Sequence, residues 1–131
     1  MALITMDGVQ LEITSVSAPE ESRAPQRQPI VFLHEGLGSV AMWRDWPATV
    51  CRATGRAGWV YSRRGYGQSS PAPEKLPPDY LHREAWDILP SLLDRLGVAH
   101  PVLLGHSDGA SIALLTPAAS PSQRALSWRH T

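Results

Sequence analysis

Apolar and polar residues alternate at the start of the chain, and this pattern predicts a β-hairpin. The stretch ALITMDGVQLEITSVS, residues 2–17, alternates on both sides of Asp7-Gly8. Because Asp-Gly readily supplies the positive φ angles of a two-residue turn, we expect two antiparallel strands joined at that point. Residues 18–29 contain three prolines and scattered charges without periodicity. That segment is typical of a surface connection.

Three short apolar runs further along the chain predict strands. Their sequences are PIVFLH at 29–34, GWVYS at 58–62 and PVLLGH at 101–106. Continuous apolar runs of this length are typical of parallel strands that are buried on both faces of a sheet.

Apolar residues recur at helical spacing between these runs. The segment 42–54 has such a repeat, and Pro47 places the start of its helix nearby. A second repeat covers 79–97, where Asp79 is a candidate helix cap and Pro90 predicts a bend. Helices are therefore expected in both connections.

The order of these elements predicts the fold class. Residues 108–115, DGASIALL, follow the third apolar run and have the composition of a buried helix. Strands that alternate with helices predict right-handed crossovers and an open, mostly parallel sheet with helices on both faces. The expected fold is thus α/β, with the hairpin at its N-terminal end, and 131 residues suffice for one domain.

Composition and charge exclude several classes of partner. Hydrophobic residues make up 43% of the chain and charged residues 18%, as in a soluble globular protein. Lys plus Arg and Asp plus Glu are equal at 12 each, which argues against binding to nucleic acid or an anionic membrane. No targeting segment and no apolar run of about 18 residues is found, so we expect a cytoplasmic protein. The single Cys51 is expected to be a core residue.

The third apolar run ends in a motif that carries chemistry. Gly105-His106-Ser107-Asp108-Gly109 fits G-x-S-x-G, in which a serine occupies a strained turn between a strand and a helix. Both glycines are expected because any Cβ there would collide across so tight a turn. The flanking sequences PVLL and ASIALL are the strand and helix that this motif requires.

A second candidate segment follows the first apolar run. His34-Glu35-Gly36-Leu37-Gly38-Ser39 is a glycine-rich loop directly after PIVFL. Acyl transfer needs two backbone N–H groups aimed at the developing oxyanion, one from the residue after the nucleophile and one from such a loop. Our candidate donors are Asp108 and Gly36, with Leu37 as a possible second loop donor. The alternative for this loop is a plain strand-to-helix turn, which also favours glycine.

Together with SRRGYGQS at 62–69, these motifs resemble the α/β-hydrolase family. The third segment is similar to the family's Asp-x-Arg-Gly-x-Gly-x-Ser type segment, with Ser62 in place of the acid. Glu35 stands where relatives usually carry the glycine of a His-Gly pair. The resemblance implies an incomplete α/β-hydrolase fold over residues 1–115, the N-terminal part of a single domain. Residues 116–131 are expected to form an aberrant or disordered tail.

The resemblance also implies roles for individual residues. Ser107 is expected to be the nucleophile, which forms an acyl-enzyme that water then hydrolyses. His34 is expected to brace the oxyanion loop, and His106 to be a packed residue at the end of its strand, not a base. Arg63 and Arg64 are expected to be loop anchors or partners of Glu35 and not ligands of the substrate.

The catalytic acid and histidine of the family pattern are missing. After Asp108 the chain contains no Asp or Glu, and His130 is the only downstream histidine. In a shifted reading frame, one permissible codon choice for 115–131 encodes Leu-Tyr-Ala-Gly-Arg-Phe-Pro-Glu-Pro-Ala-Arg-Ala-Val-Leu-Glu-Ala-His, which would complete the helix and enter another strand. A frameshift is therefore one hypothesis for the tail. A naturally short chain or an expressed fragment is the other.

Two functional hypotheses follow from the sequence. The first is a serine-dependent α/β-hydrolase that acts on esters or related small-molecule bonds without metal or cofactor, inactive in this short form. The second is a non-enzymatic binding module, or a half-protein that docks with a separate C-terminal half. The last parallel strand should form an exposed edge through which the chain can associate with itself. The histidines lack the spacing of metal ligands.

Overall fold

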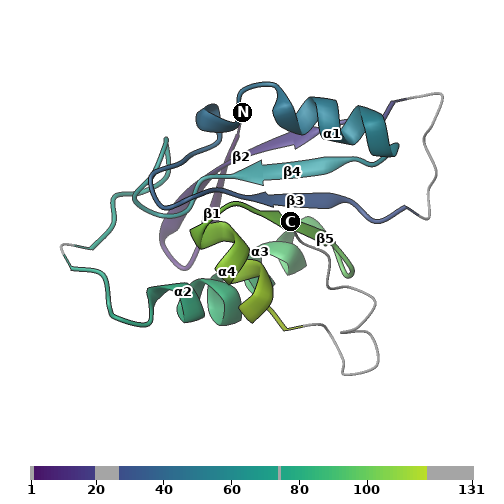
Figure 1. Ribbon diagram of the computed structural model, residues 1–131. Helices are drawn as coiled ribbons and strands as arrows, with labels where there is room; N and C mark the ends of the chain where they lie inside the picture. The colour runs from purple at the N-terminus through teal and green to yellow at the C-terminus, as the bar shows by residue number, and fades with distance from the viewer. Residues whose placement is uncertain (1, 20–26, 74, 118–131) are drawn as a thin grey trace.

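A five-stranded mixed sheet with helices on both faces forms the protein (Figure 1). The computed structural model describes residues 2–19, 27–73 and 75–117. The strands are β1 (Ala2–Met6), β2 (Val9–Val16), β3 (Ile30–Leu33), β4 (Gly58–Tyr61) and β5 (Val102–Gly105). The helical elements are η2 (Ala41–Trp43), α1 (Trp46–Thr54), α2 (Tyr80–Arg83), η3 (Glu84–Ile88), α3 (Leu89–Leu96) and α4 (Asp108–Leu115). The predicted α/β fold class is confirmed.

The N-terminal hairpin forms as the sequence predicts. β1 and β2 pair antiparallel, with Met6 opposite Val9. Asp7 and Gly8 occupy the turn with φ angles of 50° and 78°, both in the left-handed region that a tight hairpin turn requires. The predicted surface connection at 18–29 lies partly outside the described residues.

The strand order β1-β2-β4-β3-β5 places the three apolar runs side by side. β3 pairs parallel with both β4 and β5, whereas β2 joins β4 antiparallel. All four residues of β3 are buried, as expected for a strand covered on both faces. β5 lies at one edge of the sheet, opposite β1. Because β4, β3 and β5 run parallel, their C-terminal ends lie at the same end of the sheet.

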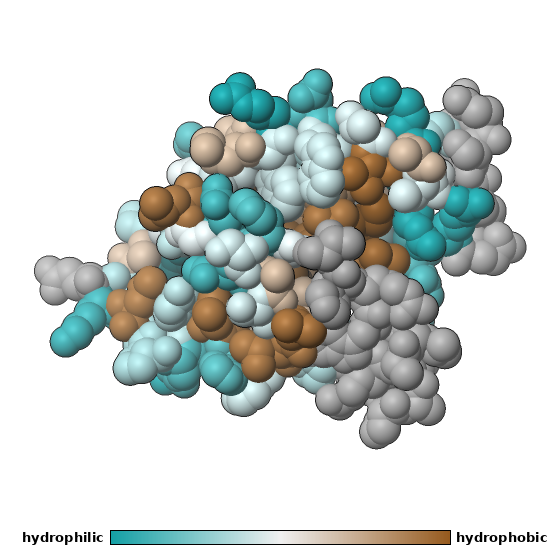
Figure 2. All heavy atoms as spheres, in the orientation of Figure 1, coloured by the Kyte–Doolittle hydropathy of each residue, from teal (hydrophilic) through white to brown (hydrophobic). Residues whose placement is uncertain are grey.

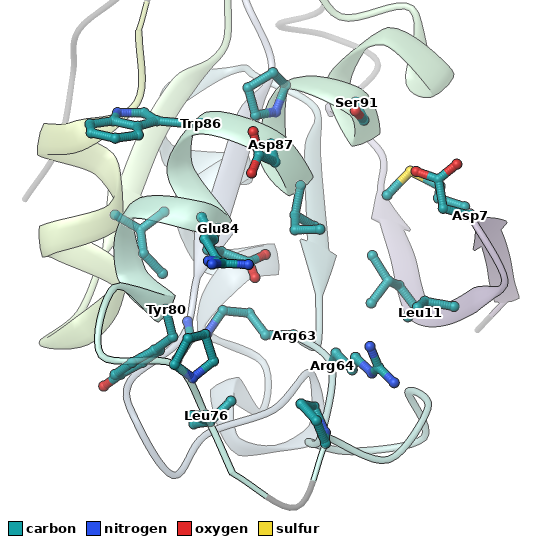
Figure 3. Close-up of a pocket in the computed structure, with 18 of the residues that line it drawn as sticks. Asp7, Leu11, Arg63, Arg64, Leu76, Tyr80, Glu84, Trp86, Asp87 and Ser91 are labelled. Atoms are coloured by element: carbon teal, nitrogen blue, oxygen red, sulfur yellow. The ribbon is translucent and has the colours of Figure 1, made fainter.

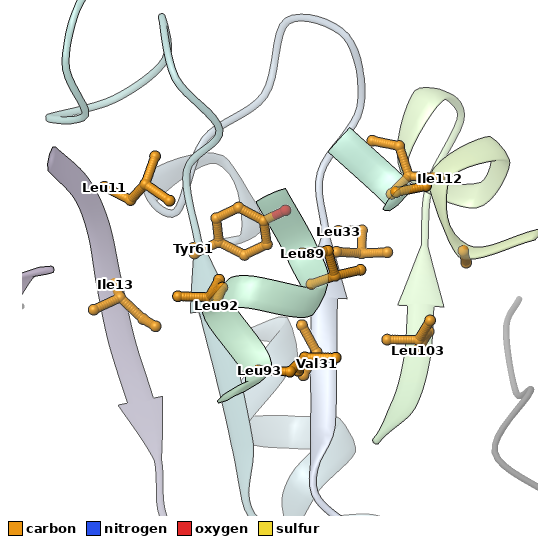
Figure 4. Packing of buried hydrophobic residues seen from close by; sticks show 12 residues of the cluster. Leu11, Ile13, Val31, Leu33, Tyr61, Leu89, Leu92, Leu93, Leu103 and Ile112 are labelled. Carbon is orange, nitrogen blue, oxygen red and sulfur yellow. The ribbon is translucent and has the colours of Figure 1, made fainter. Parts of the chain in front are cut away.

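Alternating residues of the central strands face two separate apolar clusters. In β3, Ile30 and Phe32 join the cluster under α1, whereas Val31 and Leu33 join the larger cluster under α3 and α4. Figure 4 shows side chains of the larger cluster converging from β2, β3, β4 and β5 onto the helices. Cys51 is buried in the smaller cluster, where the sequence placed it.

The helical segment from Tyr80 to Leu96 contains a widened turn at η3. There the N–H of Leu89 donates to the carbonyl oxygen of Glu84, five residues back. Pro90 follows directly and has no N–H to donate to the carbonyl four residues back, so the wide turn accommodates it. Asp79 takes the N-cap position, but its side chain does not cap the helix. Its carboxylate instead pairs with Arg83, at 3.0 Å.

α4 ends where the sequence places the end of the regular chain. The helix stops at Leu115, and Thr116 is buried, with its hydroxyl donating to the carbonyl oxygen of Ile112. Leu114 of α4 is exposed. Figure 2 shows apolar side chains on the surface over the helices below the sheet. Of the predicted tail at 116–131, residues 118–131 lie outside the described residues. Within the described ranges, no helix is long and apolar enough to cross a membrane.

We predict that Leu89→Ala lowers the free energy of unfolding by about 2–5 kcal/mol, because it leaves a cavity between η3, α3 and the sheet. Leu89 is fully buried, whereas Leu3 on β1 is 48% exposed and serves as the matched control. Urea unfolding followed by circular dichroism measures both variants. An equal loss in Leu3→Ala and Leu89→Ala would contradict the assigned core.

Candidate active site

Ser107 lies on a strained turn between β5 and α4. Its φ and ψ angles are 57° and −116°, a conformation that non-glycine residues rarely adopt. The residue is exposed at the end of the sheet where the parallel strands terminate. This is the backbone geometry of a sharp strand-turn-helix corner with the serine at its tip.

Two glycines make this corner possible. A Cβ at Gly105 would overlap the backbone of Gly109, and a Cβ at Gly109 would overlap the carbonyl oxygen of Leu33. α4 therefore rests directly on the ends of β5 and β3, with no side chain between the backbones. The collision predicted across the turn is confirmed for Gly105, whereas the Cβ of a residue at 109 would instead meet the end of the neighbouring strand β3.

The loop after β3 lies against the same corner. The amide of Gly38 donates to the carbonyl oxygen of Glu35 at 3.1 Å, which makes Gly36 and Leu37 the central residues of a turn. A Cβ at Gly36 would lie only 2.9 Å from a carboxylate oxygen of Asp108. The candidate amide donors at 36 and 108 thus belong to segments that touch. The side chain of Leu37 is 87% exposed.

His34 is buried at the base of this loop and uses both ring nitrogens. Its Nε2 accepts the amide proton of Arg63 at 3.0 Å, so its Nδ1 carries the proton and donates to the carbonyl oxygen of Glu35 at 2.6 Å. Burial, helped by the positive charge of Arg63, lowers the pKa of His34 from 6.5 to about 4. A neutral ring with both nitrogens engaged cannot take a proton from Ser107. Its contacts are those of a brace for the loop.

Arg63 is the second fixed point of the loop. Its guanidinium donates to the carbonyl oxygens of His34 and Glu35, at 2.5 and 2.9 Å. Arg64 points elsewhere, since its Nε donates to the carbonyl oxygen of Pro71 at 2.9 Å. Neither arginine forms an ion pair with the Glu35 carboxylate within the described part of the chain.

The expectation that His106 is packed at the strand end is wrong. Its side chain is 67% exposed, and its Nδ1 lies 3.8 Å from a carboxylate oxygen of Glu35, which is 43% exposed. The backbone turns at Ser107, so the strand alternation on which the expectation rested no longer applies there. His106 and Glu35 instead face each other across the gap between the two candidate loops.

A buried carboxylate that the sequence analysis did not single out stabilises the segment after β4. Glu12 of β2 accepts from the hydroxyl of Ser62 at 2.8 Å and from the amide of Gln68 at 3.1 Å. The same Ser62 hydroxyl accepts the amide proton of Val40 at 2.8 Å. Glu12 therefore reaches the loop after β3 through Ser62. Position 62 carries a serine where the resemblance leads us to expect an acid, and Glu12 on the neighbouring strand β2 supplies a carboxylate there instead.

Tyr80 joins the corner to the helices below the sheet. Its hydroxyl donates to a carboxylate oxygen of Asp108 at 3.0 Å, and this hydrogen bond raises the pKa of Tyr80. The sequence carried no signal for this contact, because it depends on how α2 packs against α4. A group that lies against Tyr80 is therefore close to the segment that carries Ser107.

No histidine is hydrogen-bonded to the Ser107 hydroxyl in the part of the chain that the structure describes. His34 is fully engaged, His82 packs its ring against Trp86, and the neighbouring His106 faces Glu35, while His130 falls outside the described residues. Within those residues no cluster of three or more His, Cys, Asp or Glu is arranged to hold a metal ion.

Comparisons with known proteins agree with the fold. A family model described as alpha/beta hydrolase fold matches residues 28–124. The sn-1-specific diacylglycerol lipase ABHD11 of Danio rerio is 29% identical over 98 residues, which cover 72% of this chain and 28% of the lipase.

Solved structures resemble the chain over most of its length. A proline iminopeptidase from Mycobacterium smegmatis superposes with a TM-score of 0.71 at 23% identity, covering 87% of this chain and 38% of the peptidase. Est816, an N-acyl homoserine lactone degrading enzyme, gives a TM-score of 0.67 at 22% identity, covering 98% and 42%. The chain thus spans less than half the length of each of these relatives.

We predict that Glu12→Gln lowers the free energy of unfolding by about 1–3 kcal/mol, because a neutral amide oxygen is a weaker acceptor for the buried bond from Ser62 and the part-buried bond from Gln68 than the carboxylate. Hydrogen exchange at the amides of Val40 and Gln68 should also accelerate. Glu35→Gln, a change at a half-exposed carboxylate, is the matched control and should stay within about 0.5 kcal/mol. Unchanged exchange at Val40 in Glu12→Gln would contradict the path through Ser62.

Acidification should weaken the fold through His34. The unfolded ring takes up a proton near pH 6.5, whereas the folded ring resists until about pH 4, so stability is full above the first value and falls toward the second. The free energy of unfolding that is lost through protonation of His34 is about 3 kcal/mol. Urea unfolding at a series of pH values measures it as the difference between the wild type and His34→Gln. His82 is exposed, so His82→Gln should keep the wild-type dependence of the unfolding free energy on pH. If His34→Gln also keeps that dependence, the assignment to His34 is wrong.

Proposed function

We propose that this chain, which belongs to the α/β-hydrolase fold family, is part of a serine-dependent hydrolase that acts on esters or related small-molecule bonds. The observation that carries the proposal is the strained, exposed Ser107 at the end of the parallel strands. A serine held at such a cost in backbone energy is expected where its hydroxyl must meet a ligand.

In the proposed reaction the Ser107 hydroxyl oxygen attacks the carbonyl carbon of the substrate. The hydroxyl proton passes to a base, and the carbonyl oxygen becomes an oxyanion. The amide of Asp108, at the first helical residue of α4, has no partner within the helix and can donate to that oxyanion. Gly36, with Leu37 as a possible second donor, would supply the opposing amide. Collapse expels the alcohol and leaves an acyl-Ser107 ester, which water hydrolyses.

His34, Arg63 and Glu12 have positioning roles in this proposal. They fix the loop after β3 through the contacts at its carbonyl oxygens and at the amide of Val40. A fixed loop matters because preorganised donors stabilise a developing oxyanion without having to reorient during the reaction.

No base is hydrogen-bonded to the Ser107 hydroxyl within the described residues, so we expect this chain to react slowly. A serine hydroxyl is a poor nucleophile at neutral pH without a base. The similarity to a diacylglycerol lipase and to a lactone-degrading enzyme supports an ester or related bond as the target. We also propose that the protein is cytoplasmic, as predicted from the sequence.

A second candidate is a non-enzymatic binding module, or a half-protein that docks with a separate C-terminal half. The position of β5 at the edge of the sheet favours it, because an edge strand offers unpaired backbone groups for association. Size in solution and ester turnover separate the two candidates. A chain that self-associates or requires a second half, and turns over no ester, supports the second.

We predict that a small fluorophosphonate probe labels Ser107 slowly and at that residue alone, as mapped by mass spectrometry. Ser107→Ala should lose the adduct completely. Ser111→Ala is the matched control, because it changes a serine one turn further along α4 and leaves the corner intact. Labelling that survives in Ser107→Ala would remove the nucleophile assignment.

A further inference from the structure

A cavity of about 580 Å³ is lined by Tyr80, whose hydroxyl bonds to Asp108 of the candidate active site (Figure 3). It lies between β2, the loop that follows β4, and the helical segment from Tyr80 to Asp94. Its volume falls within the range of about 300–1,000 Å³ that is typical of small-molecule sites. None of the motifs in the sequence pointed to it, because its walls come from segments far apart in the chain.

The interior of the cavity is apolar. Leu11 and Ile112 form part of its buried wall, and Leu76 and Trp86 contribute exposed apolar surface. The remaining apolar wall includes Met6, Val9, Pro73, Pro77 and Ile88. A ligand that fills this space must therefore offer apolar surface.

The two charged groups of the wall that are not exposed, Arg63 and Glu84, already have partners. Arg63 donates to two backbone carbonyl oxygens, and Glu84 accepts the hydroxyl of Tyr61 at 2.7 Å. Burial raises the pKa of Glu84, which disfavours a charge there. The other charged side chains of the wall are exposed to solvent: Asp7, Arg64, Arg83, Asp87 and Asp94. A charged ligand group would thus stay at the rim, while the interior takes an apolar group.

The cavity and the corner at Ser107 share side chains. The ring of Tyr80 lines the cavity while its hydroxyl bonds to Asp108, the residue next to Ser107. Tyr66 also lines the cavity and packs its ring against His34, with centroids 5.1 Å apart. The hairpin turn at Asp7 lies beyond Tyr61, at the same end of the sheet as Ser107. Cavity and corner therefore open at one end of the molecule.

We propose that this cavity binds the apolar group of the substrate, an alkyl or aryl chain attached to the bond that Ser107 attacks. The inference rests on the proposed function for its link to catalysis, but binding of an apolar chain can be measured without any reaction. The cavity borders β2 and the loop after β4, so it lies away from the edge strand β5.

Titration with 1-octanol, followed by ¹H–¹⁵N NMR of the full chain, tests the binding. Saturable shifts are expected at the amides of Tyr80 and Glu84 and at the indole N–H of Trp86. Leu76→Trp, which fills the mouth of the cavity, should weaken octanol binding at least tenfold. Leu3→Trp is the matched control, because it adds the same side chain at a similarly exposed leucine outside the cavity and should leave binding unchanged.

Two further measurements separate this inference from the proposed function. Ser107→Ala should bind octanol like the wild type, and an octyl phosphonate probe should label wild-type Ser107 faster than a methyl phosphonate probe, a preference that Leu76→Trp abolishes. If octanol binds at the cavity but neither probe labels Ser107, the proposed function fails and the cavity remains a binding site. If both probes label Ser107 equally and octanol shifts no cavity amide, the function stands and this inference is overturned.

Discussion

The direct contact between the backbones of α4 and the strand ends is the constraint on which the candidate site depends. Because neither Gly105 nor Gly109 carries a Cβ, the helix starts immediately above β5 and against the carbonyl oxygen of Leu33. The chain can make that turn only if Ser107 adopts a positive φ, which an ordinary residue avoids. The packing that anchors α4 through Ile112 and Ala113 in the main core offsets this local cost.

A second level of organisation comes from buried polar groups that connect three separate segments. Glu12 on β2, Ser62 after β4 and His34 after β3 are almost completely buried, and each is hydrogen-bonded to another segment. Buried polar groups of this kind cost free energy unless they are satisfied, so the network permits only one arrangement of the loops. The loop bearing Gly36 is thereby held against α4, independently of its own flexible glycines.

The helical segment from Tyr80 to Leu96 serves both the core and the site. Leu89 and Leu92 pack under the sheet, and Tyr80 at its start reaches Asp108. The wide turn before Pro90 lies between these two parts of the segment. The same helix that completes the core thus also forms one wall of the apolar cavity, which couples the shape of the cavity to the stability of the fold.

The sequence alone determined the elements, their order and the corner at Ser107, because hydrophobic periodicity and glycine sterics are local properties of the chain. It also pointed to the loop at Gly36. It did not predict that His106 is exposed, because the alternation of side chains along β5 ends at the turn. Only the tertiary structure decided that Glu12 supplies the carboxylate beside Ser62, that Tyr80 contacts Asp108, and that a cavity lies between β2 and the helices. These features depend on side chains that meet across 28 or more positions of the sequence, and packing, not local pattern, brings such residues together.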